Sequence, residues 1–229
     1  MIRLFVSTSL FQGTISLSAS QIHYIYTVMR LKPGAWIEVF NGKDGGWKAV
    51  CLEKTEQRLY VKECIHDQPE ALPCLHLYIS LFKRLDWVLE KSTELGVTHI
   101  HPVLTQRSSV RHFNVERAYR IVQEASEQSG RYTLPNIMPL ISFEDALRKA
   151  PKGWVAHMNS WDTKKNSFTQ VKFPINLWIG PEGGWSECEL EIFQRYKEIY
   201  PLPLAQFCLR AETAVVAALI TLQNKAQVS

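Results

Sequence analysis

The stretch Ile175-Asn-Leu-Trp-Ile-Gly180-Pro-Glu-Gly-Gly184 joins an apolar run to a glycine-rich loop, and Ser186-Glu-Cys-Glu189 follows almost at once. The apolar run predicts a buried strand. The serine, with a glutamate three residues later, predicts a capped helix start. Glycines between a strand and a helix let backbone amides approach a ligand closely. The loop is neither a P-loop nor a dinucleotide fingerprint. It therefore predicts a ligand-binding loop of another kind, with a plain turn as the alternative.

A second junction of this type follows at Leu209-Arg-Ala-Glu-Thr-Ala214. We expect a strand near Leu204–Cys208 before it and the last helix from about Glu212. The carboxyl ends of parallel strands meet at one edge of a sheet, so the two loops together predict one ligand cleft. The alternative is that Glu212 and Thr213 only cap the helix and that Arg210 is a surface partner of Glu212.

From residue 75 onward the pattern alternates between strand and helix. This alternation predicts a mostly parallel sheet covered by helices. The expected strands are 75–81, 98–103, 154–158 and 175–179, and the expected helices are 85–95, 114–129, one from Ser142 and one after Ser186.

The first part of the chain is different, because short strands dominate it. They are expected at 4–6, 35–40, 47–53 and 59–65, with turns at Lys32-Pro-Gly34 and Asn41-Gly42 and one helix from about 18 to 29. This pattern predicts a small β-barrel. Pro69–Pro73 is the expected linker, which gives two domains, 1–70 and 75–229.

Composition excludes several classes of protein. The 229 residues are 46% hydrophobic, which excludes a disordered chain. We see no apolar run of about 18 residues and no signal peptide, so we expect a soluble cytoplasmic protein without a membrane span. The five cysteines form no C-x-x-C pair, which favours reduced thiols. A net charge of +4 fits a polyanionic partner but does not require one.

Three further features carry weaker signals. The basic and polar stretches 106–111 and 124–131 fit either a phosphate-contacting surface or a solvated helix face. His99 and His101 would share one strand face, but no third ligand stands at an obvious spacing, so we expect no metal site. The last helix contains Val215–Ile220, which is apolar on almost every side. Such a helix packs in its own core or against a second subunit.

The two loops in this order resemble the RsmE family of 16S ribosomal RNA uridine-N3 methyltransferases, within the SPOUT class. Further resemblance covers nearly the whole chain. The further segments that resemble the family are residues 3–6, His23 together with residues 28–34, Asn41-Gly42, residues 91–97, Arg107-Ser108, and Glu124-Ala125 together with residues 128–131. The chain departs from the family pattern at Ala205, at the short segment Leu81–Asp86 and at Asn159.

The resemblance implies an α/β protein with an N-terminal PUA-like RNA-binding β-barrel and a C-terminal SPOUT-type methyltransferase domain containing a trefoil knot. It also implies a homodimer, and S-adenosylmethionine as the methyl donor. The implied cofactor-binding residues are Ile179, Gly180, Pro181, Glu182, Gly183, Gly184, Leu204, Leu209, Arg210, Ala211, Glu212, Thr213 and Ala214.

The implied substrate is a specific uridine of 16S rRNA in the small ribosomal subunit. We expect Arg210 to face the uracil oxygens, Glu212 to position or accept the N3 proton, and Lys91 and Glu94 to complete the site. The expected RNA contacts are Arg3, Arg30, Lys32, Arg107, Ser108, Arg111, Gln128 and Arg131.

The same chemistry on another structured RNA remains an alternative, as does a non-catalytic RNA-binding protein. A nucleotide-dependent oxidoreductase is disfavoured because G-x-G-x-x-G is absent.

Overall fold

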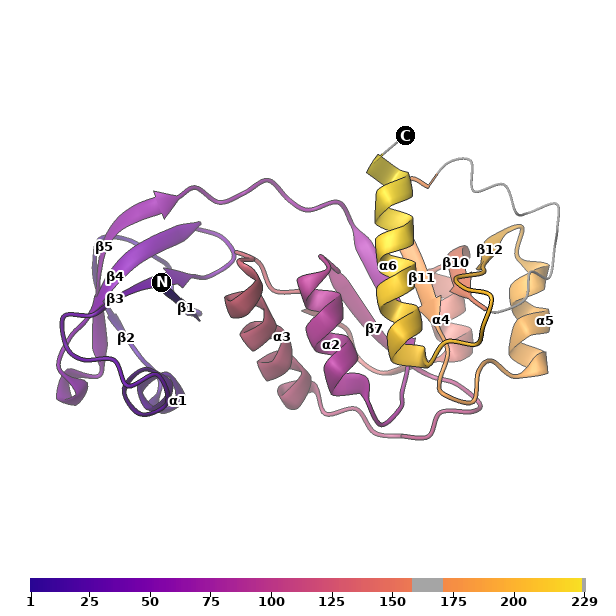
Figure 1. Cartoon of the computed structure of the whole chain (residues 1–229), viewed down its shortest axis with the longest axis horizontal. Helices are drawn as coiled ribbons and strands as arrows, with labels where there is room; N and C mark the ends of the chain where they lie inside the picture. Colours follow the sequence, from indigo (N-terminus) through magenta and orange to yellow (C-terminus); the bar gives the residue numbers. More distant parts are fainter. Residues whose placement is uncertain (158–170, 228–229) are drawn as a thin grey trace. The chain divides into compact units, whose positions relative to one another are not determined.

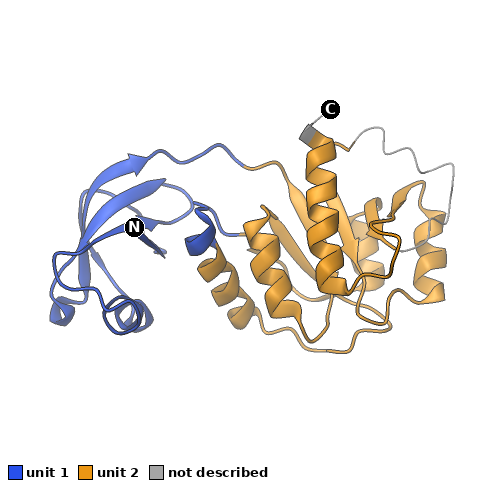
Figure 2. Cartoon of the chain, viewed as in Figure 1, with its two compact units in different colours: residues 1–71, 126–134 blue, residues 72–125, 135–229 orange. Residues whose placement is uncertain are grey.

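A computed structural model describes residues 1–157 and 171–227, which form two compact units (Figure 2). Unit 1 comprises Met1–Ala71 together with Ser126–Leu134, and unit 2 comprises Leu72–Ala125 together with Pro135–Ser229. The second piece of unit 1 was expected in the C-terminal domain. Met158 and Asn159, two positions used in the sequence analysis, lie outside the described residues.

Unit 1 is built on a five-stranded sheet in the order β1-β3-β4-β5-β2. The strands are β1 (Ile2–Phe5), β2 (Gly13–Ser16), β3 (Trp36–Phe40), β4 (Gly46–Cys51) and β5 (Arg58–His66). The helix α1 (Ala19–His23) continues as a π-helical turn η1 (Tyr24–Val28), and a short 3-10 turn η2 (Lys54–Glu56) precedes β5.

Local sequence explains most of these elements. Ser18 and Gln21 form a capping box at the start of α1. Gly42 and Gly45 have positive φ angles in the β3–β4 turn, as the Asn-Gly signal predicts. Strand β2 was missed, because its only inward apolar residue is Ile15.

Unit 2 contains a parallel sheet in the order β12-β10-β11-β6-β7-β8, and β9 also pairs with β7 (Figure 1). The prediction of a mostly parallel sheet is confirmed. Its strands are β6 (Leu75–Ser80), β7 (His99–Leu104), β8 (Asn136–Ile137), β9 (Ile141–Ser142), β10 (Lys152–Ala156), β11 (Ile175–Ile179) and β12 (Glu198–Leu202).

Helices cover both faces of this sheet. Residues of α2 (Leu85–Glu94), α3 (Val115–Ser129) and α6 (Ala211–Gln227) share one buried apolar cluster with β6 and β11. Residues of α4 (Phe143–Lys149) and α5 (Glu187–Arg195) share another with Trp178 of β11. No helix among the residues that the structure describes is long and apolar enough to cross a bilayer.

The predicted strand Leu204–Cys208 is wrong. The strand is β12, which ends at Leu202, and residues 203–210 form a loop. Pro201 lies inside β12, where a proline is atypical of a strand. A proline is tolerated in β12 because this strand is at the sheet edge and pairs only with β10 among the described strands.

Candidate active site

Strand order places a crevice at the carboxyl edge of the unit 2 sheet. From β6 the chain goes to β7 on one side, whereas β10, β11 and β12 lie on the other. Open parallel sheets bind ligands outside the carboxyl ends of strands where the order reverses. His157, directly after β10, and the loops that follow β11 and β12 meet there, so the fold brings together the two loops that the sequence singled out.

A cavity of about 350 Å³ lies between these loops. The implied cofactor residues that line it are Ile179, Gly180, Pro181, Glu182, Gly183, Gly184, Leu204, Leu209, Ala211 and Ala214. Arg210, Glu212 and Thr213 are not among its lining residues. The cavity residues that were not among the implied cofactor-binding residues are Arg107, Ala156, His157, Trp185, Ala205, Phe207 and Cys208. All of these except Ala156 lie in the segments after β7, β10, β11 and β12, so extending each candidate loop from the preceding strand to the following helix would have included most of them.

The glycine-rich loop is held in one conformation by the segment after β7. The Arg107 guanidinium donates hydrogen bonds to the carbonyl oxygens of Gly183, at 3.0 Å, and Trp185, at 3.2 Å. Ser109 donates to the Glu182 carboxylate at 2.9 Å. Gly184 has a φ of 67°, a left-handed conformation that favours glycine. One wall of the cavity is therefore fixed by contacts that are distant in sequence.

The capping box after this loop makes a second connection. Glu189 accepts a hydrogen bond from the Ser186 backbone at 2.8 Å, and its other oxygen accepts one from the Gln106 backbone at 2.8 Å. Ser108 is buried, and its hydroxyl lies 3.0 Å from that of Ser80 and 2.9 Å from that of Thr105. Arg107 and Ser108 are predicted RNA contacts, and in the structure both contact residues that hold these loops, with Arg107 exposed and Ser108 buried.

The N-terminus of α6 carries a carboxylate paired with a guanidinium. Glu212 is buried, and Arg84 donates to its carboxylate at 3.0 Å. Arg84 lies in the loop after β6 and was missed as a site residue. A basic side chain directly after a central strand is the signal that could have found it. Arg210, the other proposed partner of Glu212, is exposed.

Lys91 and Glu94 are not brought to this cavity. They pair with each other at 2.7 Å on α2, and Lys91 also pairs with Glu90 at 2.8 Å. They lie seven and ten residues beyond Arg84, which is about 10–15 Å along a helix. Neither lines the cavity.

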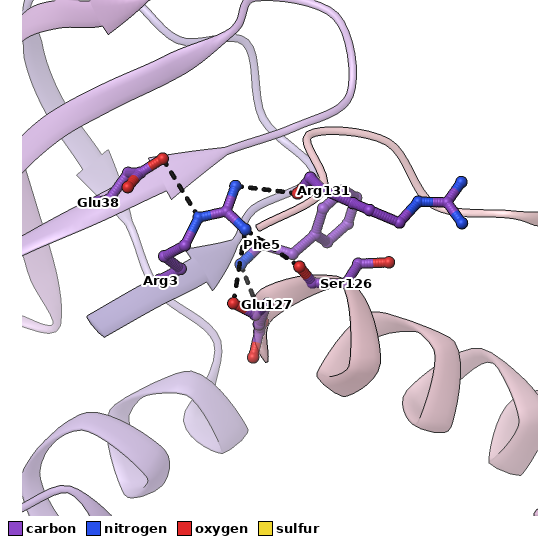
Figure 3. A network of polar contacts seen from close by, with 6 residues as sticks. All are labelled: Arg3, Phe5, Glu38, Ser126, Glu127 and Arg131. Atoms are coloured by element: carbon purple, nitrogen blue, oxygen red, sulfur yellow. Dashed lines mark hydrogen bonds and ion pairs between the residues drawn. The ribbon is translucent and has the colours of Figure 1, made fainter. Parts of the chain in front are cut away.

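Arg3, a predicted RNA contact, is used inside unit 1 instead (Figure 3). Its side chain is 11% exposed and pairs with Glu38 at 3.2 Å. It also donates to the carbonyl oxygens of Ser126, Glu127 and Arg131, and its guanidinium lies over the rings of Phe40 and Tyr132. These contacts fasten the 126–134 segment to β1 and β3, so Arg3 has a structural role.

The other predicted RNA contacts differ in exposure. Arg131 is half-buried, and burial lowers the pKa of its guanidinium to about 10. Its side chain extends away from Arg3 in Figure 3. Exposed side chains remain at Arg30, Lys32, Arg111 and Gln128.

A histidine cluster lies on the sheet at a distance in sequence from these loops. His76 joins the predicted pair, with its Nδ1 3.0 Å from His101 Nε2 and its ring stacked on His99. Burial, reinforced by the neighbouring histidines, lowers the pKa of His101 to about 3. Within the described residues there is no group of three or more His, Cys, Asp or Glu side chains placed to hold a metal ion.

Each of the two units matches a known protein family. Residues 69–223 match the model of an RNA methyltransferase domain, and residues 17–64 match that of an RNA methyltransferase PUA domain. The ribosomal RNA small subunit methyltransferase E of Rickettsia conorii is 32% identical over 95% of this chain and 93% of its own length. That of Synechocystis is 32% identical over 91% of this chain and 72% of its own length.

Solved structures agree over almost the whole chain. A Legionella pneumophila methyltransferase in complex with S-adenosylmethionine has a TM-score of 0.86 and 26% identity, covering 97% of each chain. The Neisseria gonorrhoeae ribosomal RNA small subunit methyltransferase E, bound to the same molecule, has a TM-score of 0.82 and 32% identity, covering 98% of this chain and 97% of its own. The PUA-like and methyltransferase assignments made from sequence are thus confirmed, and this chain belongs to the ribosomal RNA small subunit methyltransferase E family.

Proposed function

We propose that this protein transfers a methyl group from S-adenosylmethionine to N3 of one uridine in the rRNA of the small ribosomal subunit. The observation that carries the proposal is the cavity between the glycine-rich loop and the 203–214 segment, with the Glu212–Arg84 pair beside it. Family membership gives the reaction class, and the resemblance stated above supplies the target atom.

The cavity residues fit S-adenosylmethionine. The volume falls within the roughly 300–1,000 Å³ of small-molecule sites. Ile179, Leu204 and Leu209 offer apolar walls for a flat base, and the adjoining loops offer backbone amides and carbonyls for polar edges. When bound, this donor supplies a methyl group that its sulfonium already activates.

The target atom defines what the protein must do. Uridine N3 lies on the Watson–Crick edge and carries a proton, so the base must be unpaired before transfer. We assign to Arg210, exposed just before α6, the stabilisation of negative charge on the uracil oxygens. We assign to Glu212 the positioning or acceptance of the N3 proton. Ala211 and Ala214 line the cavity, so Glu212 lies in the helical turn between two cavity residues.

Arg84 keeps the Glu212 carboxylate in place. The Arg84 side chain is 63% exposed, whereas that of Glu212 is 10% exposed. Because Arg84 stays largely solvated in the pair, it positions the buried carboxylate at little desolvation cost to itself.

Further features of the proposal follow from the family. We infer that Arg30, Lys32, Arg111 and Gln128, all exposed, contact rRNA phosphates. We infer a homodimer, supported by Ile220, an apolar residue of α6 that is 44% exposed. The closed PUA-like barrel and the trefoil knot belong to the same proposal, as does action in the cytoplasm, where ribosomal subunits are found.

Transfer into small ribosomal subunits tests this function. Subunits from a strain that lacks the modification are incubated with labelled S-adenosylmethionine, and their nucleosides are analysed by mass spectrometry. One new 3-methyluridine is the expected result. Label in a different nucleoside would refute the N3 assignment. Cofactor binding without any label would favour another structured RNA, and no cofactor binding would favour a non-catalytic RNA-binding protein.

A further inference from the structure

One face of the unit 1 sheet carries a group of basic and aromatic side chains, which are exposed except for the half-buried Lys48. Along β5, Leu59 and Val61 are buried, whereas Arg58, Tyr60 and Lys62 alternate with them and are exposed. Tyr60 is the cross-strand partner of Val50. Val50 in turn pairs with Trp36 of β3, so Trp36 and Tyr60 share the outer face.

This face has two different ends. At the end near Phe40, the rings of Phe40 and Tyr132 enclose the Arg3 guanidinium, and the surface is covered. At the other end Trp36 is 42% exposed and Tyr60 is 38% exposed. We call the residues of this second end, Trp36, Lys48, Arg58, Tyr60 and Lys62, the Trp36 patch.

Two ammonium groups converge on the Trp36 ring. Lys48 Nζ lies 4.5 Å from the ring centroid and Lys62 Nζ lies 5.3 Å from it. Across the described parts of the chain, neither lysine forms an ion pair, although Glu63 is the cross-strand partner of Lys48. Two like charges beside one ring repel each other, and an anion between them would relieve the repulsion.

The residue types identify the partner. Positive side chains interleaved with exposed aromatic rings are the arrangement that binds unpaired nucleotides, with cations on phosphates and bases stacked on rings. Alternate residues of a strand stand about 6.8 Å apart, so Arg58 and Lys62 present two separate cations on either side of Tyr60. An acidic peptide would use the cations but would leave the aromatic rings without a matching flat group.

We propose that the Trp36 patch binds a single-stranded segment of the substrate RNA. Lys48 and Lys62 hold a phosphate between them, Arg58 holds a second, and one base stacks on Trp36. This inference rests on the proposed function, because that function supplies an RNA partner. It adds a contact surface outside the cavity and apart from the RNA contacts already assigned.

Binding of a fluorescent single-stranded oligouridine tests the patch without requiring activity. Lys48→Gln combined with Lys62→Gln should weaken binding roughly tenfold and lower the slope of log affinity against log salt by about 0.7, because one phosphate contact is lost. Trp36→Leu should weaken binding roughly tenfold through lost stacking, with little change in the salt slope. The matched control is Lys43→Gln, an exposed lysine in the turn at the far end of β3, which should bind as the native chain does.

Native affinity and an unchanged salt slope in the double lysine variant would overturn the proposal. An unaffected Trp36→Leu variant would also overturn it, because only a general anion site would remain. A far-UV circular dichroism spectrum and a urea unfolding curve that match those of the native chain establish that each variant is folded, unit 1 included. Lys62→Glu, a single change on an exposed side chain, repeats the test if the double variant fails to fold.

The same variants separate this proposal from the proposed function. With unmodified small subunits, the double variant should raise KM for the subunit roughly tenfold and leave kcat unchanged. Normal methylation with unchanged KM and RNA affinity would refute only the patch. Patch-dependent RNA binding by a native chain that methylates nothing would refute only the proposed function.

Discussion

Arg84 and Glu212 are 128 positions apart in sequence, and the Arg84 guanidinium donates to the Glu212 carboxylate across 3.0 Å. The contact joins the loop after β6 to the first turn of α6. At the other ends of α2 and α6, Gln223 donates to the Leu95 carbonyl at 2.7 Å, again 128 positions apart. The two helices, seen next to each other in Figure 1, therefore run parallel and in register, and this register places Arg84 opposite Glu212.

Glu212→Gln should lower kcat by about 10²–10⁴-fold, because the amide cannot accept the N3 proton. Arg84→Ala should lower kcat by roughly tenfold, because Glu212 then loses its partner and its fixed position. Single-turnover methyl transfer measures both, and calorimetric S-adenosylmethionine affinity is the control. Native turnover in Glu212→Gln would remove Glu212 from the reaction.

Arg210→Ala should nearly abolish turnover while cofactor binding stays detectable. Its guanidinium is exposed, so its removal changes no packed contact, and the loss should fall on the charged transition state. Arg210→Lys should recover part of the rate, because the charge remains without the planar donor pair. A KM increase with normal kcat in Arg210→Ala would instead identify Arg210 as an RNA-binding residue.

Arg107 and Arg111 provide a matched pair of exposed arginines from one segment. Arg107→Ala removes the hydrogen bonds that hold Gly183 and Trp185, so S-adenosylmethionine affinity should fall roughly tenfold. Arg111→Ala should leave cofactor affinity unchanged and weaken RNA binding with a reduced salt slope. Calorimetry with the cofactor and titration with RNA measure the two effects. The reverse result, with Arg107 affecting only RNA, would restore the role that sequence alone assigned to it.

Local patterns predicted those parts of the site that local chemistry determines. The capping box and the strand before Gly180 depend on neighbouring residues, and both are present. The pairing of Lys91 with Glu94 is also local, since residues three apart on a helix meet. That pattern already favoured an ion pair on the helix surface over a catalytic role.

Contacts between residues that are far apart in the sequence could not be predicted from local patterns. Arg3 resembles any basic residue in sequence, yet its partners lie 35 to 128 positions away. In the sequence, Arg107 likewise resembles any surface cation, and only the fold shows that it contacts Gly183. The β12 strand was missed because tolerance of Pro201 depends on its edge position, which is a property of the whole sheet.

Arg3→Met should destabilise the protein by about 3–5 kcal/mol, because it leaves Glu38 buried without its cation and three carbonyl oxygens without their donor. Urea unfolding monitored by tryptophan fluorescence measures the change. Arg120→Met, at an exposed arginine of α3, is the control and should change stability by less than about 0.5 kcal/mol. Equal stability of the two variants would contradict the structural role of Arg3.

His101 should make the protein less stable in mild acid. Its ring is 8% exposed and stacks on Tyr78 at 4.2 Å, and burial lowers its pKa to about 3 from an unfolded value of 6.5. Below pH 6.5 His101 is therefore protonated in the unfolded chain but stays neutral in the folded chain until the pH approaches 3. The stability that His101 contributes is complete above pH 6.5 and is lost as the pH falls toward 3. Between pH 7 and pH 5 this loss is about 2 kcal/mol.

His101→Phe keeps a ring against Tyr78 and removes the titration. Between pH 7 and pH 5 the unfolding free energy of the native chain should therefore fall by about 2 kcal/mol more than that of the variant. His76 and His99 act in the same direction, since burial lowers the pKa of each, so some pH dependence should remain in the variant. Urea unfolding at a series of pH values measures the difference in slope. His112→Phe, at an exposed position, is the control for replacing a histidine with an aromatic ring. Identical slopes for His101→Phe and the native chain would mean that His101 accepts its proton in the folded state, which its burial against Tyr78 and His76 opposes.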